Sequence, residues 1–314
     1  MSGDANGGSD HFGDALIARV RELGHPLCVG LDPHLDRIPP PFRAGTMAPA
    51  APATADAVEA FCRAVVDRVA GRVAAVKPQV AFFEQLGWPG MRALERVVAH
   101  ARGAGLLVVL DAKRGDIGST AAGYAQAYLA ADAPLAVDAM TLNPYLGLES
   151  LAPFAQAAQQ CGRGFFVLAK TSNPGSGELQ DLEVGGVPIY ERVAASLAPL
   201  AGRLAGPATG WSSLGIVAGA TWPAQHEALR ARLPRALFLV PGYGAQGASA
   251  DDALRGFVSG PKGLEGGLVS SSRALLFPPD GEGGDRARWE ASLDEALARS
   301  TAELAQAVAR SGAR

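Results

Sequence analysis

Short, strongly apolar runs alternate along the chain with longer segments in which apolar positions recur every three to four residues. The short runs are typical of strands that are buried on both faces, and the longer segments are typical of amphipathic helices. Strands are predicted at residues 27–32, 74–79, 106–111, 136–143, 164–170, 214–220, 237–241 and 267–272. Helices are predicted at residues 55–69, 91–104, 117–130, 190–204, 224–233 and 286–309.

Strands that alternate with helices favour one α/β domain built on a parallel sheet. The strand count predicts a single (β/α)8 TIM barrel with loop insertions, since such barrels usually need about 250 residues and this chain has 314. A doubly wound open sheet is the alternative, because a strand count taken from pattern can be wrong by one or two.

The extra length is predicted to lie in three places. Residues 1–12 have the composition of a flexible N-terminal tail, so the barrel domain is predicted to span residues 13–314. Residues 36–54 contain a run of three prolines, which cannot continue a helix or a strand, and they predict a first insertion. Residues 172–187 are polar and Gly-rich, and they predict a second insertion. Long loops of this kind in compact domains are often functional.

Composition argues against several classes of protein. The net charge of −3 provides no basic surface for nucleic acid, and no apolar run is long enough to cross a membrane. The first residues lack the features of a signal peptide. Cys28, Cys62 and Cys161 are widely spaced, which predicts reduced thiols and a cytoplasmic protein. The histidines show no metal-ligand spacing, so no metal site is expected.

Lysine is rare among the basic residues. Of the 28 basic residues only four are lysines, namely Lys77, Lys113, Lys170 and Lys262. Three of them lie at or just beyond the ends of predicted strands. An ammonium can give up a proton, whereas a guanidinium does not. The bias therefore indicates a local chemical reason for these lysines, although the sequence provides no specific role for Lys170.

The densest group of charges follows the third predicted strand. Asp111, Lys113 and Asp116 come directly after the apolar run LLVVL. Charges near a protein core are kept where they are paired or used, so the group is either an ion-pair cluster or a catalytic centre. In a barrel it would share one mouth with Asp32 and Lys77, which favours catalysis. A purely structural ion pair of Asp32 with Lys77 is the alternative.

The last two predicted strands end in anion-binding chemistry. Residues 242–247 have the sequence GYGAQG, which matches a dinucleotide fingerprint, and Glu265 lies near the acidic position that such a fingerprint requires. The motif comes late in the chain, with only one predicted strand to follow, which argues against a dinucleotide site. A phosphate-binding loop is the preferred interpretation, in which Gly244 brings its backbone N–H to an anion. Arg273 follows the eighth strand and is suited to the same phosphate.

Together these motifs resemble the orotidine 5′-phosphate decarboxylase family. The pattern DxKxxDIxxT at residues 111–120 is that family's signature, and VGLDPH, VKPQ, TSNPG, PGYGAQG and SSSR follow the family's order. The resemblance covers about residues 27–277, and the insertions resemble those of its longer bacterial branch. It implies a TIM barrel, a homodimer with both active sites at the interface, no cofactor, and the decarboxylation that makes uridine 5′-phosphate (UMP), the last step of de novo UMP biosynthesis.

The same resemblance implies catalytic roles for four residues. Lys113 would protonate C6 of the pyrimidine as carbon dioxide leaves, within a charged network that also contains Lys77, Asp111 and Asp116. Asp116 would reach into the partner's site.

The resemblance also implies a substrate-binding set. Asp32 and Lys77 would hold ribose hydroxyls, and Ser172 would contact the pyrimidine edge. Gln246 and Arg273 would bind the phosphate. The full implied set is Asp32, Lys77, Ile117, Thr120, Ser172, Gly244, Gln246 and Arg273, of which Thr120 would serve the partner's site. Asn143 and Lys170 receive no role.

Other functions fit part of the sequence. A related barrel decarboxylase or aldolase that acts on a sugar phosphate would share DxKxxD but need Mg²⁺, and it would give no reason for TSNPG. A non-catalytic phosphate-binding barrel could use the same charges to hold a dimer together. A protein that binds nicotinamide adenine dinucleotide (NAD) through GYGAQG is the third alternative.

Overall fold

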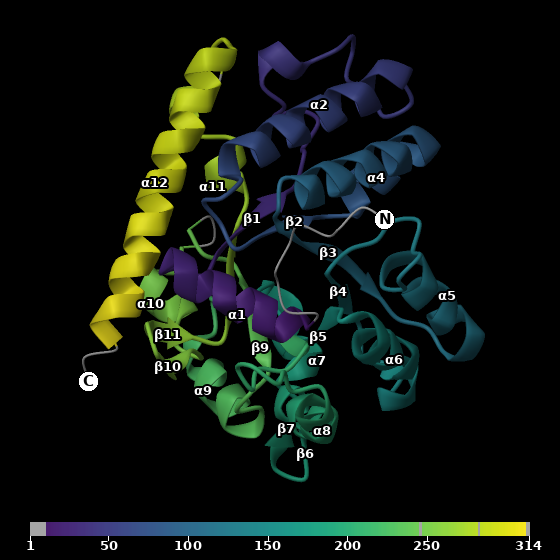
Figure 1. Cartoon of the computed structure of the whole chain (residues 1–314), viewed down its shortest axis with the longest axis vertical. Coiled ribbons are helices and arrows are strands. Elements are labelled where there is room, and N and C mark those ends of the chain that lie inside the picture. Colours follow the sequence, from purple (N-terminus) through teal and green to yellow (C-terminus); the bar gives the residue numbers. More distant parts are fainter. Residues whose placement is uncertain (1–10, 245–246, 282, 312–314) are drawn as a thin grey trace.

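The structure is a computed structural model that describes residues 11–244, 247–281 and 283–311. Within these residues, eight parallel strands close into one barrel in the order β1, β2, β3, β4, β5, β8, β9, β12. Their bounds are β1 Leu27–Leu31, β2 Ala75–Pro78, β3 Leu107–Arg114, β4 Ala139–Leu142, β5 Gly164–Lys170, β8 Leu214–Ala218, β9 Leu237–Pro241 and β12 Gly267–Ser271. All the predicted strands and the predicted TIM barrel are confirmed (Figure 1).

Helices surround the strands as an outer layer (Figure 1). The longer ones are α1 Phe12–Leu23, α2 Pro52–Val69, α4 Gly87–Gly103, α5 Gly118–Tyr128, α6 Ala152–Cys161, α8 Ile189–Arg203, α9 Pro223–Arg232 and α12 Arg286–Ser311. Every predicted helix is confirmed, with ends shifted by a few residues. The prediction lacks α1 and α6. Helix α6 has only ten residues, which is near the shortest length at which a helical period can be recognised.

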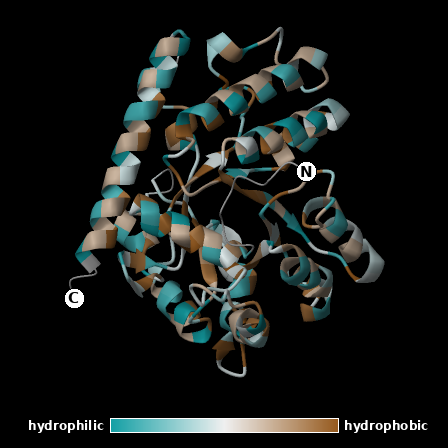
Figure 2. Ribbon diagram, viewed as in Figure 1, coloured by the Kyte–Doolittle hydropathy of each residue, from teal (hydrophilic) through white to brown (hydrophobic). Residues whose placement is uncertain are grey.

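Apolar side chains cover both faces of the strands, which explains why the strands are continuous apolar runs. Along β1, Leu27, Val29 and Leu31 belong to the apolar layer beneath the helices, whereas Cys28 belongs to the smaller cluster inside the barrel. This alternation is expected of barrel strands. Figure 2 shows the matching pattern on the helices, which alternate between apolar and polar residues along their length.

Helix α1 closes the end of the barrel where the strands begin. Phe12 is buried there, and its ring meets Phe166 edge to face at 6.0 Å between centroids. Gly164 makes room for the ring, because an added Cβ would lie 2.2 Å from it. The predicted tail over residues 1–12 is therefore wrong at its C-terminal end, since burial of this aromatic ring makes Phe12 part of the fold. Residues 1–10 lie outside the described part of the chain.

The first predicted insertion is shorter than expected. It includes the 3-10 turn η1 (Pro40–Phe42), but α2 already begins at Pro52. The prediction of residues 36–54 as a loop is therefore wrong for its last three residues. Proline fits the first turn of a helix because the N–H that it lacks has no partner there.

The second predicted insertion has regular structure of its own. Residues 172–187 contain two short helical segments, η3 and α7, and most of a small hairpin of strands β6 and β7. The bounds are η3 Pro174–Ser176, α7 Gly177–Gln180, β6 Glu183–Val184 and β7 Val187–Pro188. No helix in the described ranges is both long and apolar enough to cross a bilayer.

Candidate active site

The carboxyl ends of the strands meet at one mouth of the barrel because all the strands are parallel. The residues predicted for the site come from several of these ends: Asp32 after β1, Lys77 in β2, Asp111 and Lys113 in β3, Ser172 after β5, Gly244 after β9, and Arg273 after β12. Enzymes with this fold carry their active sites at this mouth.

Asp111 lies at the centre of a charged cluster. Lys77 Nζ donates a hydrogen bond to Asp111 Oδ2 at 2.9 Å, and Lys113 Nζ donates to Asp111 Oδ1 at 2.6 Å. Thr141 Oγ1 donates to the same Oδ1 at 3.0 Å. The structure therefore brings together three of the four predicted catalytic residues and adds Thr141, which the sequence analysis missed. Its one sequence signal is a hydroxyl within the apolar run of β4.

Strand β3 departs from regular geometry at these charges. Its register against β4 shifts between Leu110 and Arg114, and Lys113 has a φ of 49°. This left-handed conformation costs a residue with a side chain on the order of 1 kcal/mol. Thr141 Oγ1 supports the irregular segment by accepting hydrogen bonds from the N–H groups of Ala112 at 3.0 Å and Lys113 at 2.8 Å. The bulge leaves the Lys113 side chain 44% exposed at the mouth.

The charges in this cluster fix one another's ionisation. Burial alone would raise the pKa of Asp111, but the charges of Lys77 and Lys113 and their hydrogen bonds outweigh burial and lower the pKa well below its ordinary value. Burial alone would lower the pKa of Lys77, but the charges of Asp111 and Asp32 outweigh burial and raise the pKa. Near neutral pH, Asp111 therefore stays a carboxylate and Lys77 stays an ammonium.

Two buried polar atoms at the mouth have no partner. Asp32 Oδ1 and Ser272 Oγ lack a hydrogen-bond partner within the described structure. Both lie beside Gly30, where an added Cβ would be 3.4 Å from Asp32 Oδ1 and 3.2 Å from Ser272 Oγ. Buried polar atoms are rarely left unpaired, so these two indicate a place for polar groups of a ligand. Ser272 was not predicted, although it belongs to the SSSR motif.

Ser172 is held at the mouth by close backbone packing. Gly219, which follows β8, approaches so closely that an added Cβ would lie 2.7 Å from Ser172 Cα. Thr221 Oγ1 donates a hydrogen bond to the Ser172 carbonyl at 3.3 Å, and the Gly219 N–H donates to the Lys170 carbonyl at 2.7 Å. The direction in which the chain leaves β5 is therefore fixed by its neighbour strand.

The predicted phosphate-binding residues come from adjacent strand ends. Gly242 and Gly244 have φ values of 101° and 73°, which residues with a Cβ rarely adopt. Arg273 begins the short helix α11 (Arg273–Leu276) after the neighbouring strand β12, and its side chain is exposed. Gln246 lies outside the described residues.

Three residues of the signature motif do not join the charged cluster of this chain. Asp116 Oδ1 accepts a hydrogen bond from the N–H of Ile117 at 2.8 Å, and Asp116 forms no ion pair within the described ranges. Ile117 and Thr120 are exposed. Asn143, whose role was open, accepts a hydrogen bond from the Tyr145 N–H at 3.0 Å and shapes its own turn.

Large apolar side chains are exposed on the connections after β2, β3 and β4, which are neighbours in the barrel. We call these residues the exposed apolar surface. They are Trp88 (73% exposed), Ile117 (55%), Tyr145 (78%), Leu146 (47%) and Leu148 (42%). This surface adjoins Asp116 in the sequence.

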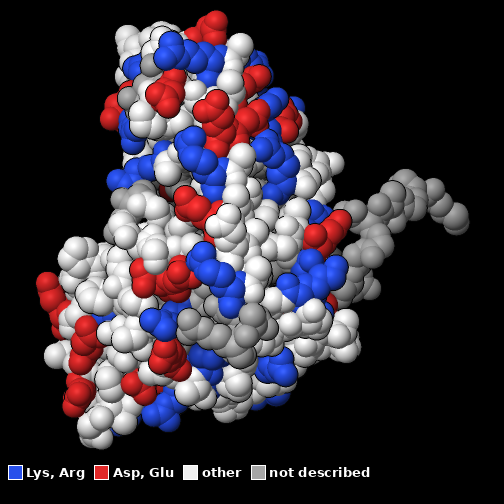
Figure 3. Space-filling model, turned by 90° about the vertical axis from the view of Figure 1, so that its left-hand side faces the viewer, with Lys and Arg blue, Asp and Glu red and all other residues white. Residues whose placement is uncertain are grey.

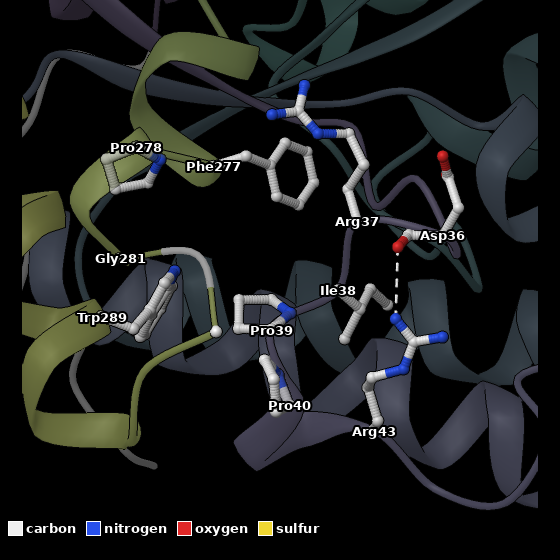
Figure 4. Close-up of a pocket in the computed structure, with 11 residues that line it drawn as sticks. Asp36, Arg37, Ile38, Pro39, Pro40, Arg43, Phe277, Pro278, Gly281 and Trp289 are labelled. Atoms are coloured by element: carbon white, nitrogen blue, oxygen red, sulfur yellow. Dashed lines mark hydrogen bonds between the residues drawn. The ribbon is translucent and has the colours of Figure 1, made fainter.

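A cavity of about 280 Å³ lies between the first insertion and the chain after α11. In Figure 4, Arg37 lies beside the ring of Phe277, with 4.8 Å from the guanidinium carbon to the ring centroid. Arg43 donates to the Asp36 carbonyl at 3.2 Å. None of the residues in the charged cluster lines this cavity. Because Phe277 directly follows α11, the first insertion packs against the segment that carries Arg273.

Charged side chains of both signs are interspersed over the face that α12 covers (Figure 3). This face therefore presents no extended basic surface of the kind that binds nucleic acid. In the described part of the chain, no group of three or more His, Cys, Asp or Glu side chains is placed to hold a metal ion. Glu265, considered for a dinucleotide site, instead accepts hydrogen bonds from Arg21 and Trp211.

Comparison with known proteins identifies the family. The model of the "Orotidine 5'-phosphate decarboxylase / HUMPS family" matches residues 25–276, a range that contains every candidate residue above. The chain belongs to this family. Its members include a relative named orotidine 5′-phosphate decarboxylase from Rhodopirellula baltica, which is 43% identical over 93% of this chain and 97% of its own length. A relative of the same name from Deinococcus radiodurans is 45% identical over 85% of this chain and 89% of its own length.

Solved structures agree with this assignment to the orotidine 5′-phosphate decarboxylase / HUMPS family. The OMP decarboxylase of Leishmania donovani superposes with a TM-score of 0.69 at 35% identity, over 94% of this chain and 99% of its own. A crystal structure of a Toxoplasma gondii protein superposes with a TM-score of 0.80 at 32% identity, over 97% and 99% of the two chains. The barrel and its insertions are thus matched along almost the whole chain.

Proposed function

We propose that this chain is an orotidine 5′-phosphate decarboxylase that converts orotidine 5′-phosphate to UMP in the last step of de novo UMP biosynthesis. The observation that carries the proposal is the Lys113 ammonium, held 2.6 Å from Asp111 and presented at the barrel mouth by a bulge. Relatives that match this chain at 43% and 45% identity carry the name of this activity.

The charged cluster has the parts that such a reaction needs. When the bond between C6 and the carboxylate breaks, carbon dioxide leaves and the electron pair stays on C6. The Lys113 ammonium would stabilise this developing charge and then transfer a proton to C6, and solvent would return a proton to its amine. This charge exists only in the transition state and product-like carbanion, so the interaction would accelerate the reaction and not merely tighten substrate binding.

Asp111 and Lys77 would hold Lys113 in position before the substrate arrives. Asp111 is ionised because the neighbouring charges lower its pKa, so it keeps both ammonium groups at hydrogen-bond distance. Pre-organised charges need no rearrangement during the reaction, which is the main source of electrostatic catalysis.

The remaining predicted residues fit the parts of a nucleotide around this centre. We propose that the unpaired Asp32 Oδ1 accepts a hydrogen bond from a ribose hydroxyl, and that Lys77 also binds the ribose hydroxyls. Ser172 would bind the pyrimidine edge. The phosphate would be bound by the Gly244 N–H, Arg273 and Gln246. Binding energy from the distant phosphate would then contribute to the rate at C6.

We also propose a homodimer with shared active sites. The exposed apolar surface supports a partner, because its large side chains come from the connections after three neighbouring strands and exposed apolar surface of this kind marks interaction sites. Asp116 and Thr120 flank Ile117 of this surface along the chain, Thr120 is exposed, and Asp116 accepts a hydrogen bond from the Ile117 N–H and forms no ion pair with the charged cluster in the described residues. In the dimer, Asp116 and Thr120 of one subunit would complete the site of the other.

We expect the enzyme to work in the cytoplasm. Cys28 and Cys62 are buried and form no disulfide in the described structure, as expected of a reducing compartment. Burial raises the pKa of the Cys28 thiol to about 12, so this residue is an inert part of the core.

The test is an assay for loss of orotidine 5′-phosphate absorbance with purified protein in excess EDTA. We expect turnover without added metal, and a fall on the order of 10³-fold or more for Lys113→Ala. Lys262→Ala is the matched control, since Lys262 is exposed in the turn between β10 (Val258–Gly260) and β11 (Gly263–Glu265) and should leave the rate unchanged. No turnover, or turnover that needs Mg²⁺, would contradict the proposal and favour the sugar-phosphate alternative.

A further inference from the structure

Lys170 is a fully buried cation at the mouth that the proposed mechanism does not use. It ends β5, its side chain is 0% exposed, and its Nζ donates to Asp181 Oδ1 at 2.6 Å. The ammonium also lies 4.7 Å from the ring centroid of Trp222 and 5.9 Å from that of Tyr190. A buried ammonium is costly unless it is paired, so the identity of its partner decides what it does.

The partner belongs to the second insertion and not to the barrel. Asp181 directly follows α7, and its side chain is 42% exposed. The ion pair therefore joins the end of a barrel strand to this added segment. Because Lys170 is buried and Asp181 is not, the lysine is the fixed member and the insertion is the part that it holds.

A second contact, between Thr171 and Gln180, lies next to this ion pair and joins the same two ends of residues 171–180. The Thr171 N–H donates to Gln180 Oε1 at 2.9 Å, and Gln180 Nε2 donates to Thr171 Oγ1 at 2.8 Å. Trp222 Nε1 donates to the Thr171 carbonyl at 3.0 Å. Residues 170 and 171 are thus joined to residues 180 and 181, and Ser172 is the next residue within the closed loop.

We propose that the Lys170–Asp181 ion pair positions Ser172 for the pyrimidine edge and so sets the preference of the site for a planar base. Gly219 supports Ser172 from the barrel side, and the ion pair fixes the insertion on the other side. Lys170 is then a positioning residue, since it acts through Ser172 and touches neither the reacting carbon nor the phosphate. This inference rests on the proposed function.

The test compares two ligands, one of which carries a hydroxyl in place of the base. Dissociation constants of UMP and of ribose 5-phosphate are measured by calorimetry for the wild type, Lys170→Met and the double variant Lys170→Met/Asp181→Asn. The double variant removes both charges, so it leaves no unpaired ion if the single variant folds poorly. We expect both variants to bind UMP about tenfold more weakly, with ribose 5-phosphate affected less than twofold. Lys170→Arg, which keeps the charge, should recover part of the UMP affinity.

Arg163→Met is the matched control, because Arg163 forms a partly buried ion pair with Asp138 at 2.9 Å, just before the opposite end of β5. It should lower the melting temperature without changing the ratio of the two affinities. Equal weakening of both ligands, or no change of the ratio in the Lys170 variants, would overturn the positioning role. Because binding is measured without turnover, failure of the decarboxylase assay in the wild type is a separate result that contradicts the proposed function.

Discussion

Lys77 lies one residue before the end of β2 and Lys170 ends β5. Both side chains are buried and each forms an ion pair with one carboxylate, yet the two partners differ in kind. Lys77 pairs with Asp111, which is itself buried, belongs to the adjacent strand and is shared with Lys113. Lys170 pairs with Asp181, which is partly exposed and belongs to an insertion. The first pair is part of the barrel, whereas the second joins the barrel to an added segment.

The difference separates two tasks. Transition-state stabilisation requires charges that are fixed before the reaction, and strands β2, β3 and β4 provide them through hydrogen bonds among Lys77, Asp111, Lys113 and Thr141. Under the further inference, recognition of the base depends on the second insertion, which begins with Ser172 and is held to β5 by the Lys170–Asp181 ion pair. Changes at Lys77 and its neighbours should therefore affect kcat, and changes around Lys170 should affect binding of the base.

The largest effect is expected for Asp111→Asn. The amide can still hydrogen-bond, but it removes the carboxylate that pairs directly with the buried Lys77 ammonium and with Lys113. We expect kcat to fall on the order of 10³-fold and the free energy of unfolding to fall by about 3 kcal/mol. Steady-state kinetics and denaturant unfolding measure both. A variant that retains wild-type kcat would show that the charge on Asp111 is not needed for catalysis.

A smaller effect is expected for Thr141→Val. The substitution keeps the shape but removes the hydroxyl that donates to Asp111 and accepts from the bulge of β3. Loss of these hydrogen bonds costs about 1–3 kcal/mol, so kcat should fall about tenfold to a hundredfold with little change in KM. Thr141→Ser is the control and should stay close to the wild type. If Thr141→Val changed KM and left kcat intact, the charged cluster around Asp111 would serve substrate binding and not catalysis.

The smallest effect is expected for Gly219→Ala. The added Cβ would meet Ser172 Cα at 2.7 Å, so the insertion must shift while the charged cluster stays in place. KM should rise about tenfold, with kcat reduced no more than about threefold. Gly103→Ala is the control, because Gly103 ends α4 with open space around it. A large loss of kcat in Gly219→Ala would remove the distinction between the two regions.

The sequence predicted the barrel because its strands are buried on both faces and form short apolar runs. Phe12 was assigned to a tail because its burial depends on Gly164 and Phe166, which are distant in the sequence. Pro52 was assigned to a loop because proline cannot continue a helix, but proline can also begin one, and Pro52 is the first residue of α2.

The candidate site was predicted from residue type and order, but its internal geometry was not. Thr141 is one hydroxyl in an apolar strand, and its partners depend on the register shift between β3 and β4. Lys170 was noticed because lysine is rare in this chain, but its partner could not be identified, since several acidic residues of the second insertion lie at similar distances along the sequence.

The most direct measurement mixes two inactive variants, Lys113→Ala and Asp116→Ala, under conditions in which subunits exchange. If each site combines Lys113 of one subunit with Asp116 of the other, a hybrid dimer carries one site with both defects and one intact site. Statistical exchange makes about half of the dimers hybrid, so about a quarter of the wild-type activity should appear on mixing. If mixing restores no activity although subunit exchange is demonstrated, Asp116 does not serve the partner's site and the shared centre is contradicted.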